Sequence, residues 1–441
     1  MKSWVVSGAR EQAQATGDPG MQSRSWSMQR GPMRRAMLFA GALSLAMWAG
    51  AGAASATDIS VTIPAYSSYT APFFQQAAKD FEALHPDVHI KITVVSWQNL
   101  FQVLTTDIAG GSPPDLSIIG TRWLYDFASQ GVAEPLDSYM TPAFKSKFIP
   151  VFFEPSTVKG QIMALPVAAS VRAMMVNLDV MHKAGVDTPP ATWDALYTDA
   201  AKIAAMKGYF GLALQGKGIE TDAYYYYALW NFGGNIFLPD GKSGLGEPAA
   251  IAAVDFYKKM IDQKLTQPTP TNYSQNETFD LFKQGHVGFV FTYPMLIPQV
   301  KAEAPNMHYA VVPIPSEKTH ATYGVTDSLM MFKASKVKKE TWSFVQFLYQ
   351  KNARAKFDQQ EGFLPVMKDV AALPYYQGNP DMKAFAAGLP YAKFAPTVPN
   401  WEQDADIIVR NLQRIYLGEV SPEVGMKDAA TEINKVMAQN N

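Results

Sequence analysis

The chain has 441 residues, 48% of them hydrophobic, and a formal net charge of −1. This length allows two domains with cores of their own, and a near-neutral charge without any basic run argues against a nucleic-acid partner. The sequence contains no cysteine, which excludes a disulfide framework, a thiolate zinc site and a cysteine nucleophile.

The first 56 residues are predicted to be an N-terminal extension that ends in a secretory signal peptide. Three arginines between positions 30 and 35 precede an apolar run, 36–54, and small residues end this run at Ala56. This order of positive, apolar and small residues is typical of an export signal. A membrane anchor is the alternative, but the strongly apolar part is short for a bilayer span. We expect cleavage near Ala56 and a periplasmic mature chain that starts near Thr57.

The segment from residue 58 to residue 131 alternates strand-like and helix-like patterns. Residues 58–63, "DISVTI", alternate apolar and polar side chains, as a half-buried strand does. The next segment offers Ser68 or Thr70 as a helix cap and ends at "HPD". Such alternation predicts a mostly parallel sheet with helices on both faces. The predicted strands are 58–63, 88–95 and 115–120, and the predicted helices are about 68–84, 99–111 and 122–131.

The pattern changes after Gly160. Two apolar stretches surround Pro166, and helical patterns then dominate, with a mainly helical last hundred residues. Two α/β lobes joined by short crossings fit this order better than separate domains on a linker. The predicted helices are about 192–206, 222–232, 247–263 and 274–284, and the predicted strands are 287–292, 308–314 and 328–333.

Common catalytic and metal motifs fail when they are tested against the sequence. The "GKS" at 241–243 has Ile236 where a P-loop needs its first glycine, and there is no G-x-S-x-G. His85 and His89 are four residues apart, but Pro86 between them favours a helix stop followed by a strand over a zinc site. A glycosidase with paired carboxylates is still an alternative, because such pairs form between residues that are distant in the sequence. The sequence does not single out any such pair.

The aromatic residues carry a different signal. Sugars present apolar faces and polar rims, so a sugar site needs aromatic platforms together with polar side chains. Tyr66 and Trp123 follow the first and third predicted strands, where open parallel sheets bind ligands. Core packing is the alternative for each aromatic residue taken alone. The candidate platforms are Tyr66, Trp97, Trp123, Tyr227, Trp230, Tyr293 and Trp401.

Two polar features accompany these aromatics. Ser67 and Ser68 lie between the first strand and its helix, where free amides can hold a ligand oxygen or the serines can cap the helix. Arg172 lies in an apolar stretch, "VAASVRAMMV". A buried arginine needs a partner, which is either an internal carboxylate or a ligand oxygen. We favour the ligand oxygen.

The stretch "DAYYYYALWNFGG", 222–234, is predicted to be a helix that ends at two glycines. Residues three or four apart share a helix face, so Trp230 shares one with Tyr226 and Tyr227. Tyr224 and Tyr225 point elsewhere and are assigned to packing or to the lobe surface. We expect the last turn, from Tyr227 to Gly234, to reach a cleft wall.

Several segments together resemble the extracellular solute-binding proteins of ABC importers, in the carbohydrate-binding group that includes maltose-binding protein. They include "FEALHPDVHIKITVV", "LTTDIAGGSPPDL", "GVAEPLD", "WNFGGNIF", "FKQGHVGFVFTYP", "GFLPV" and "GEVSPEVGMKDAATEI", and they cover most of residues 58–438 in the family's order. The resemblance implies a two-lobed α/β periplasmic-binding-protein fold, with a mixed, mostly parallel sheet in each lobe and a ligand cleft between the lobes. It also implies a carbohydrate ligand, lobe closure and an ABC permease as partner. It implies a monomer without catalysis, cofactor or metal.

The resemblance also assigns lobes and ligand contacts by position. One lobe would hold 57–165 and about 310–350, and the other 167–305 and about 355–441. Ser170 stands where maltose-binding protein has an acidic ligand residue, and two arginines leave a phosphorylated polyol such as glycerol phosphate as the alternative ligand. The expected contacts are Tyr66, Ser67, Ser68, Trp97, Thr121, Arg122, Trp123, Ser170, Arg172, Tyr227, Trp230, Gly233, Gly234, Tyr293, Thr326, Asp327, Ser328, Phe363 and Trp401.

Overall fold

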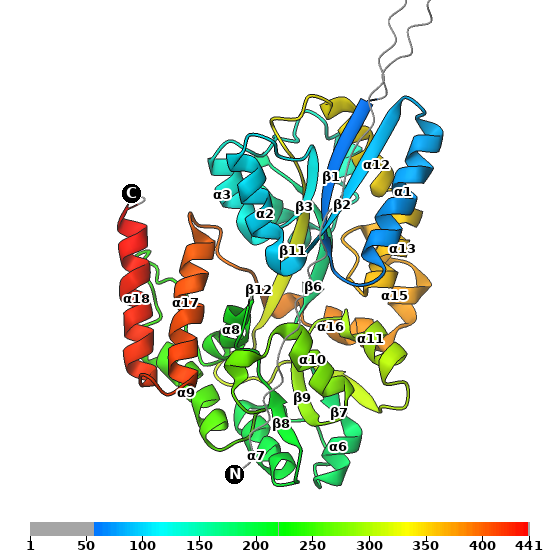
Figure 1. The fold of residues 1–441 in the computed structure, drawn as a ribbon. Helices are drawn as coiled ribbons and strands as arrows, with labels where there is room; N and C mark the ends of the chain where they lie inside the picture. The colour runs from blue at the N-terminus through cyan, green and yellow to red at the C-terminus, as the bar shows by residue number, and fades with distance from the viewer. Residues whose placement is uncertain (1–56, 219, 440–441) are drawn as a thin grey trace, which may run out of the picture. The chain divides into compact units, whose positions relative to one another are not determined.

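A computed structural model describes residues 57–218 and 220–439 (Figure 1). The expected signal peptide lies outside these residues. Within the described part of the chain, no helix is both long and apolar enough to cross a membrane. The sheets, cavities and contacts below all belong to one compact unit.

The first sheet has six strands and mixed directions. Its order is β12-β11-β3-β1-β2, with β6 paired to β11. β1 pairs in parallel with both β2 and β3, whereas β11 runs antiparallel to β3 and β6. Alternate residues of β1, Ile59, Val61 and Ile63, are buried, as its period-2 pattern predicts. The strands are β1 (Thr57–Ala65), β2 (Val88–Ser96), β3 (Leu116–Gly120), β6 (Leu165–Val171), β11 (Thr322–Met331) and β12 (Ala392–Lys393).

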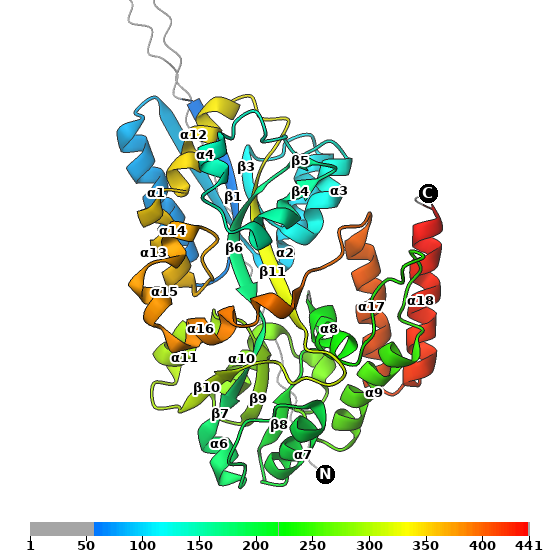
Figure 2. The same cartoon turned by 180° about the vertical axis from the view of Figure 1, so that it is seen from behind.

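Helices cover both faces of this sheet (Figures 1 and 2). The first helix begins at Thr70 and buries Phe73, Phe74 and Phe81 on one face. The helices are α1 (Thr70–Leu84), α2 (Trp97–Ala109), η1 (Thr121–Trp123), α3 (Leu124–Ser129), α4 (Pro142–Lys145), α5 (Pro150–Phe153), η2 (Glu154–Ser156), α12 (Lys338–Leu348), α13 (Lys351–Glu361), α14 (Lys368–Ala371) and α15 (Pro374–Gly378). A separate two-stranded ribbon is formed by β4 (Thr157–Val158) and β5 (Gln161–Ile162).

The second sheet has four strands in the order β10-β7-β9-β8. They are β7 (Ala173–Asn177), β8 (Phe210–Ala213), β9 (Val287–Thr292) and β10 (Tyr309–Val312). β7 runs antiparallel to β9 and β10, and β8 alone pairs in parallel, with β9. The mixed sheets that we expected are confirmed, but parallel pairs predominate only in the first. The chain passes from the first sheet to the second at Arg172, between β6 and β7.

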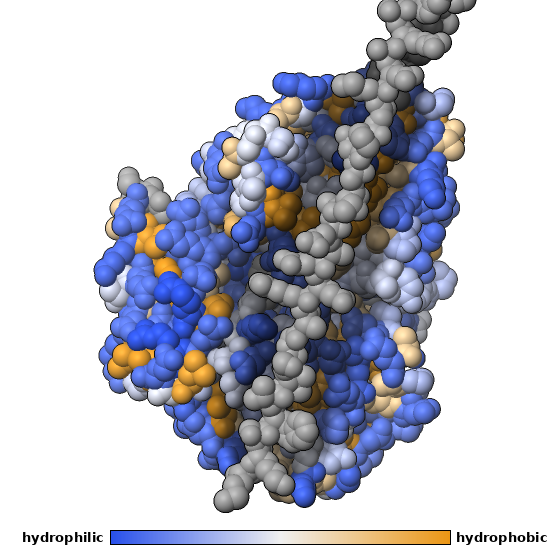
Figure 3. All heavy atoms as spheres, viewed as in Figure 1, coloured by the Kyte–Doolittle hydropathy of each residue, from blue (hydrophilic) through white to orange (hydrophobic). Residues whose placement is uncertain are grey.

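The remaining helices lie around the second sheet (Figure 1). They are α6 (Leu178–Lys183), α7 (Trp193–Ala204), α8 (Thr221–Asn231), α9 (Pro248–Asp262), η3 (Pro270–Asn272), α10 (Gln275–Lys283), α11 (Leu296–Glu303), α16 (Pro380–Ala386), η4 (Leu389–Tyr391), α17 (Trp401–Tyr416) and α18 (Pro422–Gln439). The last two form a pair that packs on α9 (Figure 1). The visible surface of this pair is mostly hydrophilic (Figure 3).

The four tyrosines of α8 are core residues. Every side chain of this helix is buried, so none of its faces is left for solvent. The hydroxyls of Tyr224 and Tyr225 donate to the carbonyl oxygens of Phe291 (2.8 Å) and Ala250 (3.1 Å), which removes the cost of burying them. Of the two alternatives for Tyr224 and Tyr225, the structure therefore selects packing.

Candidate ligand-binding site

Two adjoining cavities lie at the carboxyl ends of β1 and β3, where the first sheet faces the start of α8. The Thr326 cavity has a volume of about 470 Å³ and the Arg172 cavity about 530 Å³, both counting the space open to solvent. They share Trp97, Glu220, Val325 and Asp327 as walls. A position beyond the carboxyl ends of strands is the usual one for ligands of open α/β sheets.

The Arg172 cavity is organised by an ion pair at the crossing between the sheets. The Arg172 guanidinium donates to Ser170 Oγ (2.7 Å) and to Glu220 Oε2 (3.0 Å). Its Cζ lies 4.2 Å from the centroid of the Tyr293 ring, a cation–π contact. All four residues line the cavity. Our expectation of a ligand oxygen as the partner of Arg172 is therefore corrected: the partner is an internal carboxylate, and burial demands it.

Asp327 supplies a buried acceptor that both cavities share. The hydroxyl of Tyr66 donates to its Oδ2 (2.5 Å), while its Oδ1 is buried and has no hydrogen-bond partner among the described residues. Burial and, to a lesser extent, the charge of Glu220 raise the pKa of Asp327 to about 8, against the opposing effects of Tyr66 and Arg172. Oδ1 is thus left to hydrogen-bond a ligand, as a donor while the carboxyl is protonated and as an acceptor once it ionises.

Aromatic rings form a continuous wall beside these polar groups. Tyr66 stacks on Trp97 with ring centroids 5.9 Å apart, and the Phe363 ring meets Tyr66 edge-on at 5.0 Å. Trp97 in turn stacks on Trp123 at 5.1 Å. Trp123 is fully buried, so it supports Trp97 from behind and does not reach the cavities.

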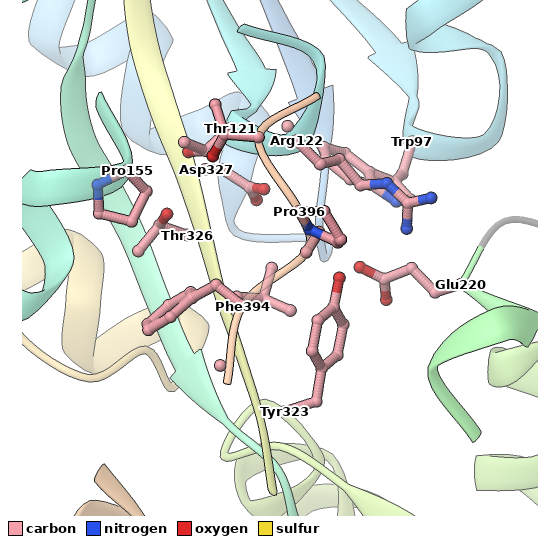
Figure 4. A pocket seen from close by; sticks show the side chains of 15 residues that line it. Trp97, Thr121, Arg122, Pro155, Glu220, Tyr323, Thr326, Asp327, Phe394 and Pro396 are labelled. Atoms are coloured by element: carbon pink, nitrogen blue, oxygen red, sulfur yellow. The ribbon is translucent and has the colours of Figure 1, made fainter. Parts of the chain in front are cut away.

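The Thr326 cavity adds hydroxyl groups and a segment from the C-terminal part of the chain (Figure 4). Thr121 Oγ1 lies 2.7 Å from Ser328 Oγ, which lies 3.0 Å from Ser156 Oγ. Thr326 Oγ1 is buried without a partner among the described residues. Phe394 packs over Gly324, where an added Cβ would lie 2.7 Å from the ring, so this glycine permits the close approach.

Many predicted contacts come together here, and others do not. Ser67 and Ser68 line a separate hollow beside Glu361. Their loop is closed internally, because the backbone N–H of Ser67 donates to Thr70 Oγ1 (3.1 Å). The predicted residues at the two cavities are Tyr66, Trp97, Thr121, Arg122, Ser170, Arg172, Tyr293, Thr326, Asp327 and Phe363. Those that line neither cavity are Ser67, Ser68, Trp123, Tyr227, Trp230, Gly233, Gly234, Ser328 and Trp401.

The end of α8 explains four of these exceptions, Tyr227, Trp230, Gly233 and Gly234. Trp230 stacks on Tyr226 at 5.4 Å, which confirms their shared face but places that face in the core. Gly233 has a φ of +87°, and an added Cβ on Gly234 would lie 2.4 Å from the Leu229 side chain. The glycines end the helix, and our expectation that its last turn reaches the cleft wall is corrected.

Sequence reasoning missed several cavity residues. Glu220 precedes α8 with a φ of +65°, and it lines both cavities. The signal for it was Arg172, because an arginine in an apolar stretch needs a buried partner. Gln275 and Asn276 at the start of α10, and the 394–397 segment, gave no signal at all.

A second buried arginine lies at the rim of the Thr326 cavity. Arg122 forms ion pairs with Asp222 Oδ2 (3.2 Å) and Glu402 Oε1 (2.5 Å). Its Cζ lies 5.6 Å from the ring centroid of Trp401, which is fully buried. Arg122 therefore joins η1 of the first sheet to α8 and α17.

The structure also bears on metal binding. No group of three or more His, Cys, Asp or Glu side chains that could hold a metal ion occurs within residues 57–218 and 220–439. His85 follows α1 as its C-terminal cap, and His89 lies in β2 with its Nδ1 3.0 Å from Glu82 Oε1. The turn followed by a strand that we predicted for these histidines is confirmed.

Each of the two sheets, with the helices beside it, forms one α/β lobe. Two such lobes, with aromatic and polar cavities at their junction, define a ligand-binding protein of the two-lobed type. A family model described as bacterial extracellular solute-binding protein matches residues 67–355. The chain belongs to this family.

Individual relatives agree with this assignment. A binding protein of Brucella abortus (strain 2308) is 50% identical over 406 residues, which cover 91% of this chain and 98% of the relative. The maltotriose-binding protein of Pyrococcus abyssi is 27% identical over 337 residues, 74% of this chain and 70% of that one. The structure of maltose-bound T. maritima MalE3 has a TM-score of 0.80 at 23% identity and covers 86% of this chain and 100% of its own, which shows the shared fold.

Proposed function

We propose that the protein captures a neutral carbohydrate in the two cavities and delivers it to an ABC importer when the lobes close. One observation carries this proposal: stacked aromatic rings adjoin two buried polar oxygens, Asp327 Oδ1 and Thr326 Oγ1, that have no partner among the described residues. Ring faces suit the apolar side of a sugar, and unpaired oxygens that can donate or accept suit its hydroxyls. The names of the Pyrococcus relative and of the T. maritima structure, which refer to maltotriose and maltose, support the same ligand class.

The ion pairs disfavour the phosphorylated alternative. A phosphate ester needs cations free to form charge-assisted hydrogen bonds. Arg172 is already paired with Glu220, and Arg122 is paired with Asp222 and Glu402. No lysine lines either cavity among the described residues. A phosphate at Arg172 would have to displace the buried carboxylate of Glu220 from its arginine, which costs several kcal/mol.

The proposed ligand contacts are the cavity residues with side chains that can reach a sugar. Trp97 and Tyr66 form the platform, and Tyr293 lines the same cavity. Asp327, Glu220 and Thr326 hydrogen-bond the hydroxyls, and Gln275 and Asn276 contribute amide groups. Glu220 and Asp327 are two carboxyl groups at one cleft, but each already has a protein partner, Arg172 for the first and Tyr66 for the second. We propose binding without turnover.

A thermal-shift panel tests this proposal. It pairs neutral saccharides and polyols with their monophosphates, for example glucose with glucose 6-phosphate and glycerol with glycerol 3-phosphate. A true ligand at 100 times its Kd adds about 2.7 kcal/mol to the free energy of unfolding. We expect shifts with neutral members only. A shift with the phosphates alone, or none in the whole panel, would overturn the ligand class, and product formation during incubation would favour a glycosidase.

Location and partners are part of the same proposal. We propose that the chain is exported to the periplasm, which the extracellular family supports, and that it is cleaved near Ala56 and monomeric there. N-terminal sequencing of exported protein tests the cleavage site. Loss of sugar uptake on deletion of the gene tests the importer, whereas retained uptake with lost chemotaxis would point to a chemoreceptor.

A further inference from the structure

The first turn of α17 contacts η1 and α3 outside the two cavities. In both ribbon views the beginning of α17 points toward α3 (Figures 1 and 2). The backbone N–H of Asn400, which precedes α17, donates to Asp126 Oδ1 of α3 (2.8 Å). Arg122 of η1 pairs with Glu402 of the same turn. We call these residues, together with Asp404 and Asp222, the α17 contact.

Negative groups outnumber positive ones in the α17 contact. Arg122 faces Glu402 from α17 and Asp222 from α8. Asp404, one turn into α17, is fully buried, and neither of its carboxyl oxygens has a hydrogen-bond partner among the described residues. Asp126 from α3 is the charged group that acts on Asp404. The basic residues of the later turns, Arg410 and Arg414, pair with α18 instead.

These surroundings disfavour a charged Asp404. Burial, and then the negative charge of Asp126, raise the pKa of Asp404 to about 7. Burial also raises the pKa of Asp126, against the hydrogen bond from Asn400, and the pKa of Glu402, against the charge of Arg122. An aspartate side chain exposed to water has a pKa of about 3.9.

We infer that the α17 contact links lobe closure to proton uptake: closing buries the Asp404 carboxyl in its protonated form, and opening returns it to water. The direction of the pH effect follows from the pKa of Asp404 in the closed and open states. Since the closed state holds the proton more tightly, closure is favoured below about pH 4 and loses this advantage as the pH rises to about 7. One such group changes the open-to-closed ratio by at most about tenfold per pH unit. This inference goes beyond sugar capture and needs no ligand for its test.

The absence of cysteine makes lobe separation directly measurable. Gln102 on α2 and Lys435 on α18 are exposed, and a Q102C/K435C chain carries two spin labels at these positions alone. Pulsed electron–electron double resonance at pH 5 and pH 8 then gives the distribution of distances between the two spin labels in the ligand-free protein. We expect a longer distance to gain population at pH 8 in the otherwise unchanged chain. In the D404N chain, we expect this pH response to shrink at least severalfold.

Matched variants keep the outcome clear. Asp406 lies on the same helix but is exposed and paired with Arg410, so D406N should keep the full response. Because Asp327 in the cavities also has a raised pKa, the comparison is repeated in a D327N background. If D404N fails to fold, D126N carries the test, with the response expected at lower pH. Equal responses with and without the substitution at Asp404 or Asp126, or no response at all, would refute the linkage.

Discussion

Two buried arginines show how different environments use the same side chain. Arg172 pairs with a single carboxylate, Glu220, and its guanidinium lies over the Tyr293 ring in the wall of a cavity. Arg122 pairs with two carboxylates, on α8 and α17, and joins these helices to the first sheet. From the sequence, both residues are candidate ligand contacts of the same kind. Because of these partners, Arg172 organises the cleft and Arg122 holds helices against the first sheet. Neither arginine is a free cation for a phosphate.

The largest effect is expected at Arg122. Arg122→Met leaves Asp222 and Glu402 buried without their cation, so the free energy of unfolding should fall by about 3–5 kcal/mol. Urea denaturation followed by circular dichroism measures this loss. Arg410→Met is the matched control, because Arg410 is half-exposed and its pairs with Asp406 and Glu432 are on the surface; it should cost less than about 1 kcal/mol. Similar losses for the two would contradict the assigned role.

Double variants sharpen the difference between one partner and two. Arg172→Met leaves only Glu220 unpaired, so adding Glu220→Gln should restore about 2 kcal/mol of stability. Arg122→Met with Glu402→Gln should recover less, because Asp222 is still buried without its cation. Unfolding free energies of the single and double variants give both coupling energies. Equal recovery at the two sites would mean that Asp222 does not depend on Arg122.

The aromatic residues of the cleft and of the core should separate in the same way. Tyr293→Ala removes a cavity wall and should weaken binding of the best panel ligand by about 1–3 kcal/mol, on the scale known for stacked bases. Trp230→Ala should lower stability instead and leave the affinity of the folded fraction unchanged, since Trp230 lines neither cavity. Calorimetric titration beside thermal unfolding reports the two effects. An affinity loss in the Trp230 variant would return that ring to the site.

The smallest effect concerns pH and the cavity carboxyl. The folded protein raises the pKa of Asp327 to about 8, so folding takes up a proton between about pH 4 and pH 8 and this contribution to stability falls as the pH rises. Asp327→Asn should flatten the dependence by about 1 kcal/mol between pH 6 and pH 7. Denaturation curves at both values test the slope, and an unchanged slope would place the Asp327 carboxyl in contact with water.

Local patterns predicted the elements well, because each depends on neighbouring residues. The period-2 run of β1, the end of α1 at His85 and the glycines after α8 are all where the sequence indicated them. The direction of pairing in the second sheet was not predictable in this way. It depends on where β9 and β10 return after long helical insertions, and no short-range pattern records that.

The site was predictable by position and not by packing. Periodicity correctly joined Tyr226 to Trp230 on one face, yet it could not show that α8 is buried on every face. For the same reason Trp97 and Trp401 looked equivalent, although one lines the cavities and the other lies beneath Arg122. Glu220 escaped detection because it meets Arg172 across 48 positions of the chain, and sequence alone does not select one carboxylate among many.

A calorimetric titration with one saccharide and its monophosphate is the decisive experiment for the proposed ligand class. We expect the neutral sugar to bind and the phosphate ester to bind more weakly or not at all, because both cavity arginines already hold carboxylates. Tighter binding of the phosphate ester would show that Arg172 or Arg122 leaves its carboxylate for the ligand. That result would contradict the proposed site.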